Sequence, residues 1–255
     1  PTDPPITLSI FAPESQQIWS TNIDGPTTIN LNDLEPSLTP GRYEVRATSG
    51  SVSTPITFFD VVSVDPVSES TSLRNRLEAC TLNSHELEIA ANLSASRIAL
   101  LEHSDELQRL LIPAESLRTE IESEVAALER GTNPYRQRTG HLWATISIAH
   151  RNVPFRMYIP ARRESPMPLV IALHGAGGDE NLFPSAYGNA EITRLADESG
   201  FVLAAPSTYL LFGAPQTASE FIDAMSVFAP IDPDRVYVIG HSLGAIAASS
   251  LARSL

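Results

Sequence analysis

Two glycines flank a serine near the end of the chain, in the run Gly240-His241-Ser242-Leu243-Gly244. A serine at this spacing is typical of a nucleophile on a sharp turn from a strand into a helix, because a Cβ at either glycine would collide with neighbouring backbone. Such a turn places the serine at the N-terminus of the helix, where free amides and the helix dipole stabilise developing negative charge. The spacing therefore predicts Ser242 as the nucleophile of an acyl-transfer reaction.

A second glycine-rich run begins at His174 and reads HGAGG. It follows an apolar segment typical of a buried strand, and a loop of this kind supplies one backbone amide of an oxyanion hole. The residue after the nucleophile, here Leu243, supplies the other amide. A phosphate-binding loop is the alternative, but the run lacks a GKS or GKT ending and the GxGxxG spacing.

The residues around these motifs alternate between strand and helix patterns. Residues 168–173 and 236–239 are continuous apolar runs, typical of strands buried on both faces. The helical patterns between them end at Gly200 and Pro230. Further strands are predicted at 141–149, 153–159 and 201–205. This alternation favours a parallel sheet wound by helices, so the fold class is α/β, and residues 132–255 are expected to form part of a doubly wound sheet.

Two other patterns precede this domain. Residues 1–65 carry short alternating runs separated by turn signals, which predict a small β-sandwich-like module. Its strands are expected at 6–11, 28–31, 43–47 and 56–59. Residues 66–131 are rich in Leu, Ala, Glu and Arg, and they contain neither Gly nor Pro from 67 to 112. They predict a helical hairpin or coiled-coil-like spacer that ends at Gly131 and offers a surface for self-association.

The charge of the chain excludes several classes of partner. The 255 residues include 30 acidic and 17 basic side chains, the latter all arginine, for a net charge of −13. Such a surface repels phosphate backbones and anionic lipids, so neither nucleic acid nor a membrane surface is an expected partner. No run approaches the ~20 apolar residues of a membrane span. The single cysteine, Cys80, excludes an internal disulfide and a cysteine-based metal site, and we predict neither a metal nor a cofactor.

Residues 131–255 resemble the α/β-hydrolase superfamily, especially bacterial secreted esterases related to polyhydroxybutyrate depolymerases, feruloyl esterases and prolyl-oligopeptidase-like hydrolases. The resemblance rests on the runs NPY from Asn133, FRMYIP from Phe155, LHGAGGDEN from Leu173 and DPDRVYVIGHSLG from Asp232. It implies cleavage of carboxylic esters, in a small or polymer-derived substrate, through a Ser242 acyl-enzyme in a secreted or periplasmic protein. It also implies that the amides of Leu243 and of Gly175 or Ala176 are the oxyanion donors. Ala245 is a small departure, since many relatives have a further glycine there.

The catalytic partners of the serine are a larger departure. In this superfamily an acid and then a histidine follow the nucleophile, but residues 243–255 contain no Asp, Glu or His. All six histidines precede the serine, at His85, His103, His141, His150, His174 and His241. We interpret the chain as an N-terminal fragment whose triad acid and histidine lie beyond Leu255, with residues 236–239 at an open sheet edge. The 255 residues alone are then expected to be catalytically incompetent, because the Ser242 hydroxyl lacks a base.

Two alternatives stand beside the esterase interpretation. One is a serine peptidase of the prolyl-oligopeptidase type, and the other is a non-catalytic protein that binds through its β-module and keeps a hydrolase-like scaffold. The joint presence of the serine, both oxyanion elements and the strand order favours an enzyme. Since no motif residue precedes Thr132, we expect a chain that begins there, and that carries the whole triad, to keep activity on small esters.

Overall fold

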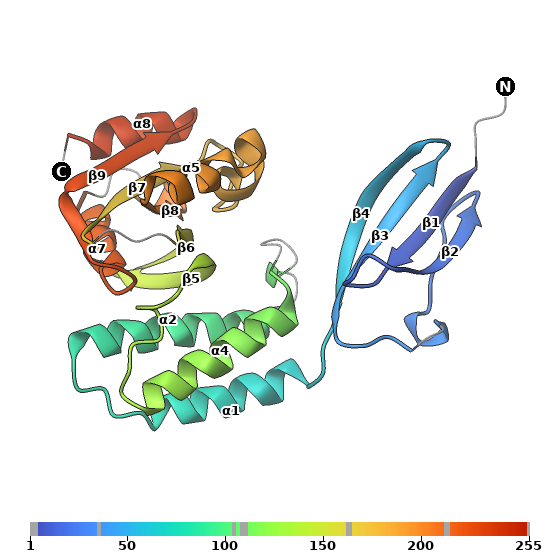
Figure 1. Cartoon of the computed structure of the whole chain (residues 1–255), viewed down its shortest axis with the longest axis horizontal. Coiled ribbons are helices and arrows are strands. Elements are labelled where there is room, and N and C mark those ends of the chain that lie inside the picture. Colours follow the sequence, from blue (N-terminus) through green and yellow to red (C-terminus); the bar gives the residue numbers. More distant parts are fainter. Residues whose placement is uncertain are drawn as a thin grey trace. The chain divides into compact units, whose positions relative to one another are not determined.

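The computed structural model describes residues 5–34, 37–103, 106–107, 112–161, 165–211 and 215–253. The chain folds into two units, one made of Pro1–Leu73 with Ile98–Glu120 and the other of Arg74–Arg97 with Ile121–Leu255. Three helices contribute residues to both units, namely α1 (Pro66–Glu78), α2 (His85–Leu101) and α4 (Ala114–Glu129) (Figure 1).

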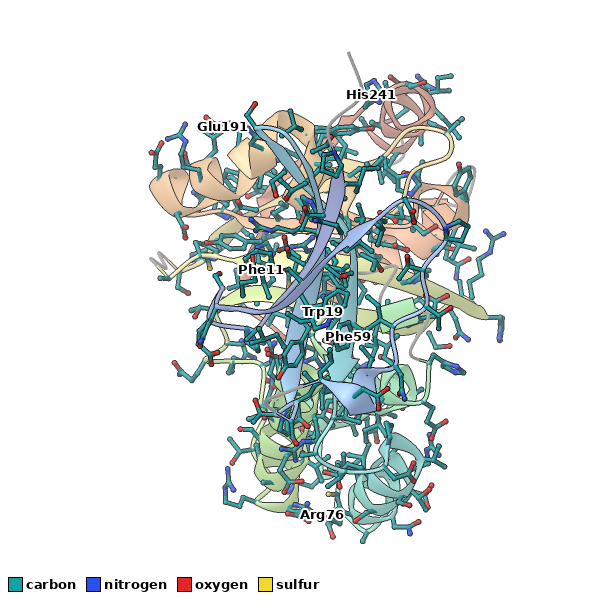
Figure 2. The ribbon with its side chains drawn as sticks, turned by 90° about the vertical axis from the view of Figure 1, so that its right-hand side faces the viewer. Phe11, Trp19, Phe59, Arg76, Glu191 and His241 are labelled. Carbon is teal, nitrogen blue, oxygen red and sulfur yellow. The ribbon has the colours of Figure 1, made fainter. Side chains whose placement is uncertain are left out.

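The first unit contains one antiparallel sheet. Its strands are β1 (Ile6–Phe11), β2 (Gln17–Ile23), β3 (Gly41–Ser49) and β4 (Val52–Val61), in the order β2-β1-β3-β4. Ile10, Tyr43 and Val45 are buried together with Leu34, which comes from the connection between β2 and β3. Trp19 and Phe59 pack against this cluster (Figure 2). A loop therefore covers the face of the sheet to which the alternate, apolar side chains of the strands point.

The expected sandwich is not found. The described residues of this unit form a single sheet, and a second sheet facing it is not among them. The predicted strand at 28–31 is wrong: these residues lead into the short 3₁₀ helix η1 (Leu31–Asp33), and Ile29 packs on the core of the sheet instead of pairing with a strand. Strand β2 was missed, because its sequence QIWSTNI lacks a strict alternation.

The helical segment forms three described helices, so the simple hairpin is wrong. Helix α1 ends at Glu78 without a Gly or Pro to stop it. Helix α2 begins anew at His85, where the Ser84 hydroxyl accepts a hydrogen bond from the Leu87 amide at 3.3 Å. A serine before a helix is a recognised N-cap, so this break was readable from the sequence. Residues 104–105 and 108–111 of the predicted helical segment lie outside the described residues.

The second unit has the α/β architecture that the sequence predicts. Its sheet has the order β5-β6-β8-β7-β9, and β7 is parallel to both of its neighbours. The strands are β5 (Gly140–Ile148), β6 (Arg151–Ile159), β7 (Met167–Leu173), β8 (Val202–Pro206) and β9 (Ile231–Gly240). The helices that follow them include α5 (Glu191–Ser199), α6 (Thr208–Leu211), α7 (Pro215–Met225) and α8 (Leu243–Leu251). As expected, α5 stops at Gly200, which adopts a left-handed φ of 71°.

Helices cover both faces of this sheet. On one face Ile192 of α5 packs with Phe183 on a cluster around Ala172, Leu203 and Ala205. On the other, the ring of Phe155 from β6 meets Phe221 of α7 edge to face, with centroids 5.5 Å apart. This layering explains why the central strands are apolar on both sides.

Side chains bond several backbone groups along the outer edge of β5, where the described residues place no further strand. Arg97 of α2 donates to the carbonyl oxygen of Trp143 at 2.7 Å, and the neighbouring Ser96 hydroxyl accepts from the amide of Thr145 at 3.0 Å. Two further groups are bonded in the same way, the His141 carbonyl by Arg138 at 3.3 Å and the Ala149 amide by Glu220 at 2.9 Å. The opposite edge is β9, as predicted, and there Tyr237 and Ile239 are exposed.

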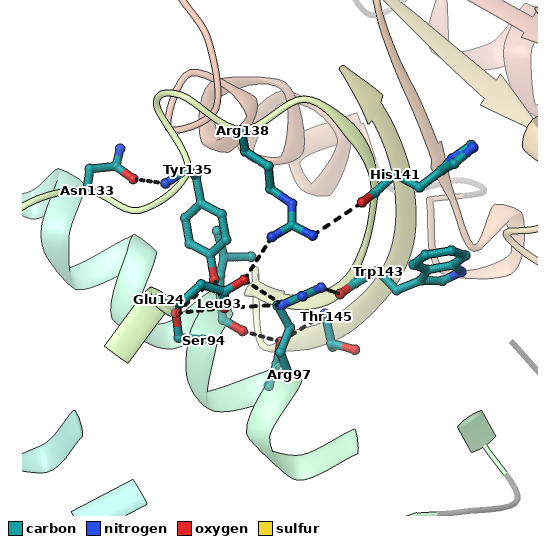
Figure 3. A network of polar contacts seen from close by, with 11 residues as sticks. Leu93, Ser94, Arg97, Glu124, Asn133, Tyr135, Arg138, His141, Trp143 and Thr145 are labelled. Carbon is teal, nitrogen blue, oxygen red and sulfur yellow. Dashed lines mark hydrogen bonds and ion pairs between the residues drawn. The ribbon is translucent and has the colours of Figure 1, made fainter. Parts of the chain in front are cut away.

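A buried polar network joins α2, α4 and the segment that leads into β5 (Figure 3). Its centre is the Glu124 carboxylate, whose side chain is 3% exposed and lies 3.0 Å from Nε of Arg97, which is fully buried. Arg138 approaches the same carboxylate at 3.1 Å, and the Tyr135 hydroxyl donates to it at 3.0 Å. Burial, together with the negative charge of Glu124, raises the pKa of Tyr135 well above its usual range, so this hydroxyl remains a donor.

This network bears on whether the helical segment is dispensable for the second unit. Glu124 and Arg97 precede Thr132, yet they are buried with residues of the second unit. A chain that begins at Thr132 would leave Arg138 and Tyr135 without their carboxylate, so the expectation that everything before it is dispensable does not fit the structure. The predicted domain boundaries after residues 65 and 131 stay a prediction.

Candidate active site

The predicted nucleophile lies on a sharp turn between β9 and α8. Ser242 has φ 54° and ψ −118°, a backbone conformation that residues other than glycine rarely adopt. The turn is held by hydrogen bonds from the Gly244 amide to the His241 carbonyl and from the Ala245 amide to the Ser242 carbonyl, both at 2.9 Å. Backbone strain of this kind costs about 1–3 kcal/mol and persists where the surrounding structure enforces it.

Neighbouring backbone atoms leave no room for a side chain at either glycine of the motif. A Cβ on Gly240 would lie 2.2 Å from the carbonyl oxygen of Gly244, and a Cβ on Gly244 would lie 1.9 Å from the carbonyl oxygen of Leu173 on β7. Both distances are far below van der Waals contact. The glycines therefore bring the turn against the end of β7, where the HGAGG run begins.

Replacing Gly244 by alanine is expected to displace this turn. The added methyl group meets backbone, which cannot rotate away, so we expect a loss of about 1–3 kcal/mol in unfolding free energy. Reaction of Ser242 with a fluorophosphonate should fall with it. Urea unfolding and probe labelling measure the two effects, and Ala245→Ser, an exposed position in the same turn, is the control. A Gly244→Ala variant with unchanged stability and labelling would contradict the steric account.

The HGAGG loop lies directly beside the serine. A Cβ built on Gly175 would be 3.3 Å from the Cβ of Ser242 and 3.0 Å from Nδ1 of His241. Ala176 is exposed, and neither its amide nor that of Leu243 has a hydrogen-bond partner among the described residues. The structure thus brings the predicted nucleophile and the three predicted amide donors to one place, with two of these amides open to a ligand.

Neither histidine of this site is placed as a base. His174 is buried, and its Nε2 accepts from the Thr208 amide at 3.1 Å, which leaves Nδ1 to donate to the Gly175 carbonyl oxygen at 2.9 Å. His241 is exposed, and its Nδ1 contacts the Tyr187 hydroxyl at 3.0 Å. His174 therefore shapes the loop, and His241 packs with its ring against Tyr187.

The other four histidines lie elsewhere. His85 and His103 flank α2, His150 is in the β5–β6 turn, and His141 is packed beside Arg156 on β6. Across the described ranges, no hydrogen bond joins a histidine ring to the Ser242 hydroxyl. Over the same residues, no group of three His, Cys, Asp or Glu side chains is placed to hold a metal ion.

His141 should make stability depend on pH. Burial, and then the positive charge of Arg156, lower its pKa from the ordinary 6.5 to about 4, against the opposing effect of Asp197. Between these values the unfolded chain takes up a proton that the folded chain does not, so stability present above pH 6.5 is lost as the pH falls towards 4. We expect urea unfolding of His141→Gln to lose less stability between pH 7 and pH 4.5 than the wild type. Equal losses would contradict this assignment.

Sequence reasoning missed one tyrosine at the site. The hydroxyl of Tyr209 accepts a hydrogen bond from the Gly177 amide at 2.7 Å, and its ring meets that of His174 edge to face at 5.4 Å. Tyr209 lies on α6, 32 positions from Gly177. Contacts between residues so far apart leave no local pattern, so the sequence offered no signal for it.

The sequence matches known proteins over part of its length. No protein family model matches the sequence. Over 96 residues the chain is 35% identical to a bifunctional acetylxylan esterase/xylanase of Neocallimastix patriciarum, a match that covers 34% of this chain and 14% of that protein. Over 119 residues it is 26% identical to feruloyl esterase B of Thermothelomyces thermophilus, covering 40% of each. The chain therefore spans less than half the length of these relatives.

Solved structures give weaker likenesses. An S-formylglutathione hydrolase from Agrobacterium tumefaciens has a TM-score of 0.36 at 20% identity, covering 45% of this chain and 54% of that one. An acetyl xylan esterase from Aspergillus awamori has a TM-score of 0.35 at 22% identity, covering 44% and 47%. In the part of the chain that the structure describes, no helix is long and apolar enough to cross a bilayer. Taken with the α/β architecture, the two curated esterases support the α/β-hydrolase superfamily that the sequence resembles.

Proposed function

We propose that the protein containing this chain hydrolyses carboxylic esters, with Ser242 as its nucleophile. The observation that carries this proposal is the backbone of Ser242, at φ 54° and ψ −118° between two glycines and against Gly175. A strained, exposed serine facing open amides has little structural use, but it suits attack on a carbonyl carbon. The curated relatives, which are named as esterases, support the same class of reaction.

The proposed reaction has two steps. The Ser242 hydroxyl oxygen attacks the ester carbonyl, its proton passes to a base, and the oxyanion that forms is stabilised by the amides of Leu243 and of Gly175 or Ala176. The carbon–oxygen bond to the alcohol then breaks, and the alcohol takes the proton from the base. Water attacks the resulting acyl-enzyme in the same manner, which releases the acid and restores the serine.

The base and the acid of the triad are proposed to come from residues downstream of Leu255. The rings of His174 and His241 are hydrogen-bonded to groups other than the serine. The curated relatives are more than twice as long as the matched region. The esterase subfamily, a bacterial source, a location outside the cytoplasm and self-association through the helical segment belong to this proposal as well. A substrate that is a small ester, or an ester released from a polymer, is consistent with the names of the relatives.

Labelling with a biotinylated fluorophosphonate tests the proposal. In the active protein that contains this chain, we expect mass spectrometry to find the probe on Ser242, and Ser249→Ala, an exposed serine of α8, to label normally. The 255 residues alone should label far more slowly, because the base is missing. Efficient labelling of another serine would refute the assignment of the nucleophile, and equal labelling of the short chain would refute a downstream base.

A further inference from the structure

The end of the HGAGG loop is fixed by a residue that the motif does not include. The side-chain oxygen of Asn181 accepts two hydrogen bonds, from the indole Nε1 of Trp143 at 3.0 Å and from Nη1 of Arg156 at 2.8 Å. Asn181 is buried, and its main-chain N–H donates to the Asp179 carboxylate at 2.8 Å. Strands β5 and β6 thus hold the chain four residues after Gly177.

Arg156 is an unusual residue for this position. It is 5% exposed, and its guanidinium carbon lies 4.3 Å over the ring of Trp143. The hydrogen-bond partners of its Nη atoms are Asn181, Ser185 and His141, which are neutral groups. Burial lowers the pKa of Arg156 to about 10, against the opposing effect of the Asp179 carboxylate, so the charge is costly to bury. A buried charge held by neutral acceptors is weak support for stability, so another role is indicated.

The beginning and the middle of the loop are fixed as well. His174 is bonded to the Thr208 amide and to the Gly175 carbonyl oxygen. The Gly177 amide donates to Tyr209, and the Gly178 amide donates to the Gly175 carbonyl oxygen at 3.1 Å. Asn181 completes this set of anchors, and it is the one held by a charged side chain.

We propose that Trp143 and Arg156 are positioning residues that hold the oxyanion loop in register with Ser242 through Asn181. This inference rests on the proposed ester hydrolysis. Oxyanion donors are effective when they are fixed before the reaction, and a displacement of about 1 Å can cost about 100-fold in rate. The main-chain carbonyl of Trp143 accepts a hydrogen bond from Arg97 of the buried network around Glu124. The ring of Trp143 points away from that network (Figure 3).

Amide hydrogen exchange tests the anchoring without any need for activity. In the 255-residue chain, Asn181→Leu and Arg156→Met should speed exchange of the Gly177 and Gly178 amides by about tenfold or more, because local opening exposes them. Asn181→Asp keeps the acceptor and should stay near the wild type. Val153→Ala, at a fully buried position of β6, controls for general destabilisation and should leave these two amides unchanged relative to the rest of the sheet. Unchanged exchange in both anchor variants, or an equal rise in the control, would overturn the proposal.

Kinetics of the active protein that contains this chain test the catalytic consequence. Asn181→Leu and Arg156→Met should lower kcat on p-nitrophenyl acetate by about 10- to 100-fold with KM changed less than about threefold, and Asn181→Asp should restore most of kcat. A rise in KM at constant kcat would show that the loop binds substrate without being positioned by these residues. Activity that survives Ser242→Ala would instead refute the proposed function. Hydrogen exchange of the Gly177 and Gly178 amides would still test whether Asn181 and Arg156 anchor the loop.

Discussion

Replacing Ser242 by alanine should lower ester hydrolysis by about 10⁶-fold, the loss seen when a serine nucleophile is removed from a triad. The reason is that the Ser242 side chain lies beside Gly175, at the proposed oxyanion loop. The fold should be unaffected, because the side chain is exposed and alanine tolerates the positive φ as poorly as serine does. The measurement is turnover of p-nitrophenyl acetate by the active protein, alongside its melting temperature.

A matched variant separates this effect from a change in the helix. Ser249→Ala removes a hydroxyl of α8 that donates to the Ala245 carbonyl oxygen at 2.9 Å, and it should keep full activity. Turnover by Ser242→Ala within tenfold of the wild type would mean that the reaction uses a different nucleophile.

Replacing Glu124 by alanine should cost about 3–5 kcal/mol of unfolding free energy, the usual effect of removing one partner from a buried ion pair. Arg97 is fully buried and would lose the Glu124 carboxylate that faces its charge, and the Tyr135 hydroxyl would lose an acceptor. Arg138 is 14% exposed, so it can turn partly to water and should contribute less. Urea unfolding of the 255-residue chain measures the loss.

A double variant distinguishes the charge from the volume. Arg97→Met combined with Glu124→Leu removes both buried charges and should cost clearly less than Glu124→Ala alone. A cost below about 1 kcal/mol for the single variant would show that the network is hydrated and unimportant for stability. By the same reasoning, a chain that begins at Thr132 should be less stable than one that includes residues 74–131.

Local patterns predicted the parts of the site that depend on neighbours in sequence. The GxSxG run fixed the turn at Ser242, because backbone sterics within five residues decide which side chains fit there. The apolar runs that became β7 and β9 were equally readable, since strands buried on both faces need apolar residues at every position.

Features that depend on residues far apart in sequence were not predictable. Two partners of Glu124, Arg138 and Arg97, lie 14 and 27 positions from it, and Asn181 lies 25 positions from Arg156. The false strand at 28–31 makes the same point, because its residues alternate as a strand would, yet Ile29 packs on the core of the sheet instead of pairing with a strand.

The bonded groups along the outer edge of β5 have a consequence for assembly. Strand addition between copies needs a row of unpaired backbone groups, and at this edge one group each of His141, Trp143, Thr145 and the following Ala149 is already bonded to a side chain. Of the two edge strands of the described sheet, β9 is therefore the one more readily extended by a further strand, whether that strand comes from the same protein or from a second copy.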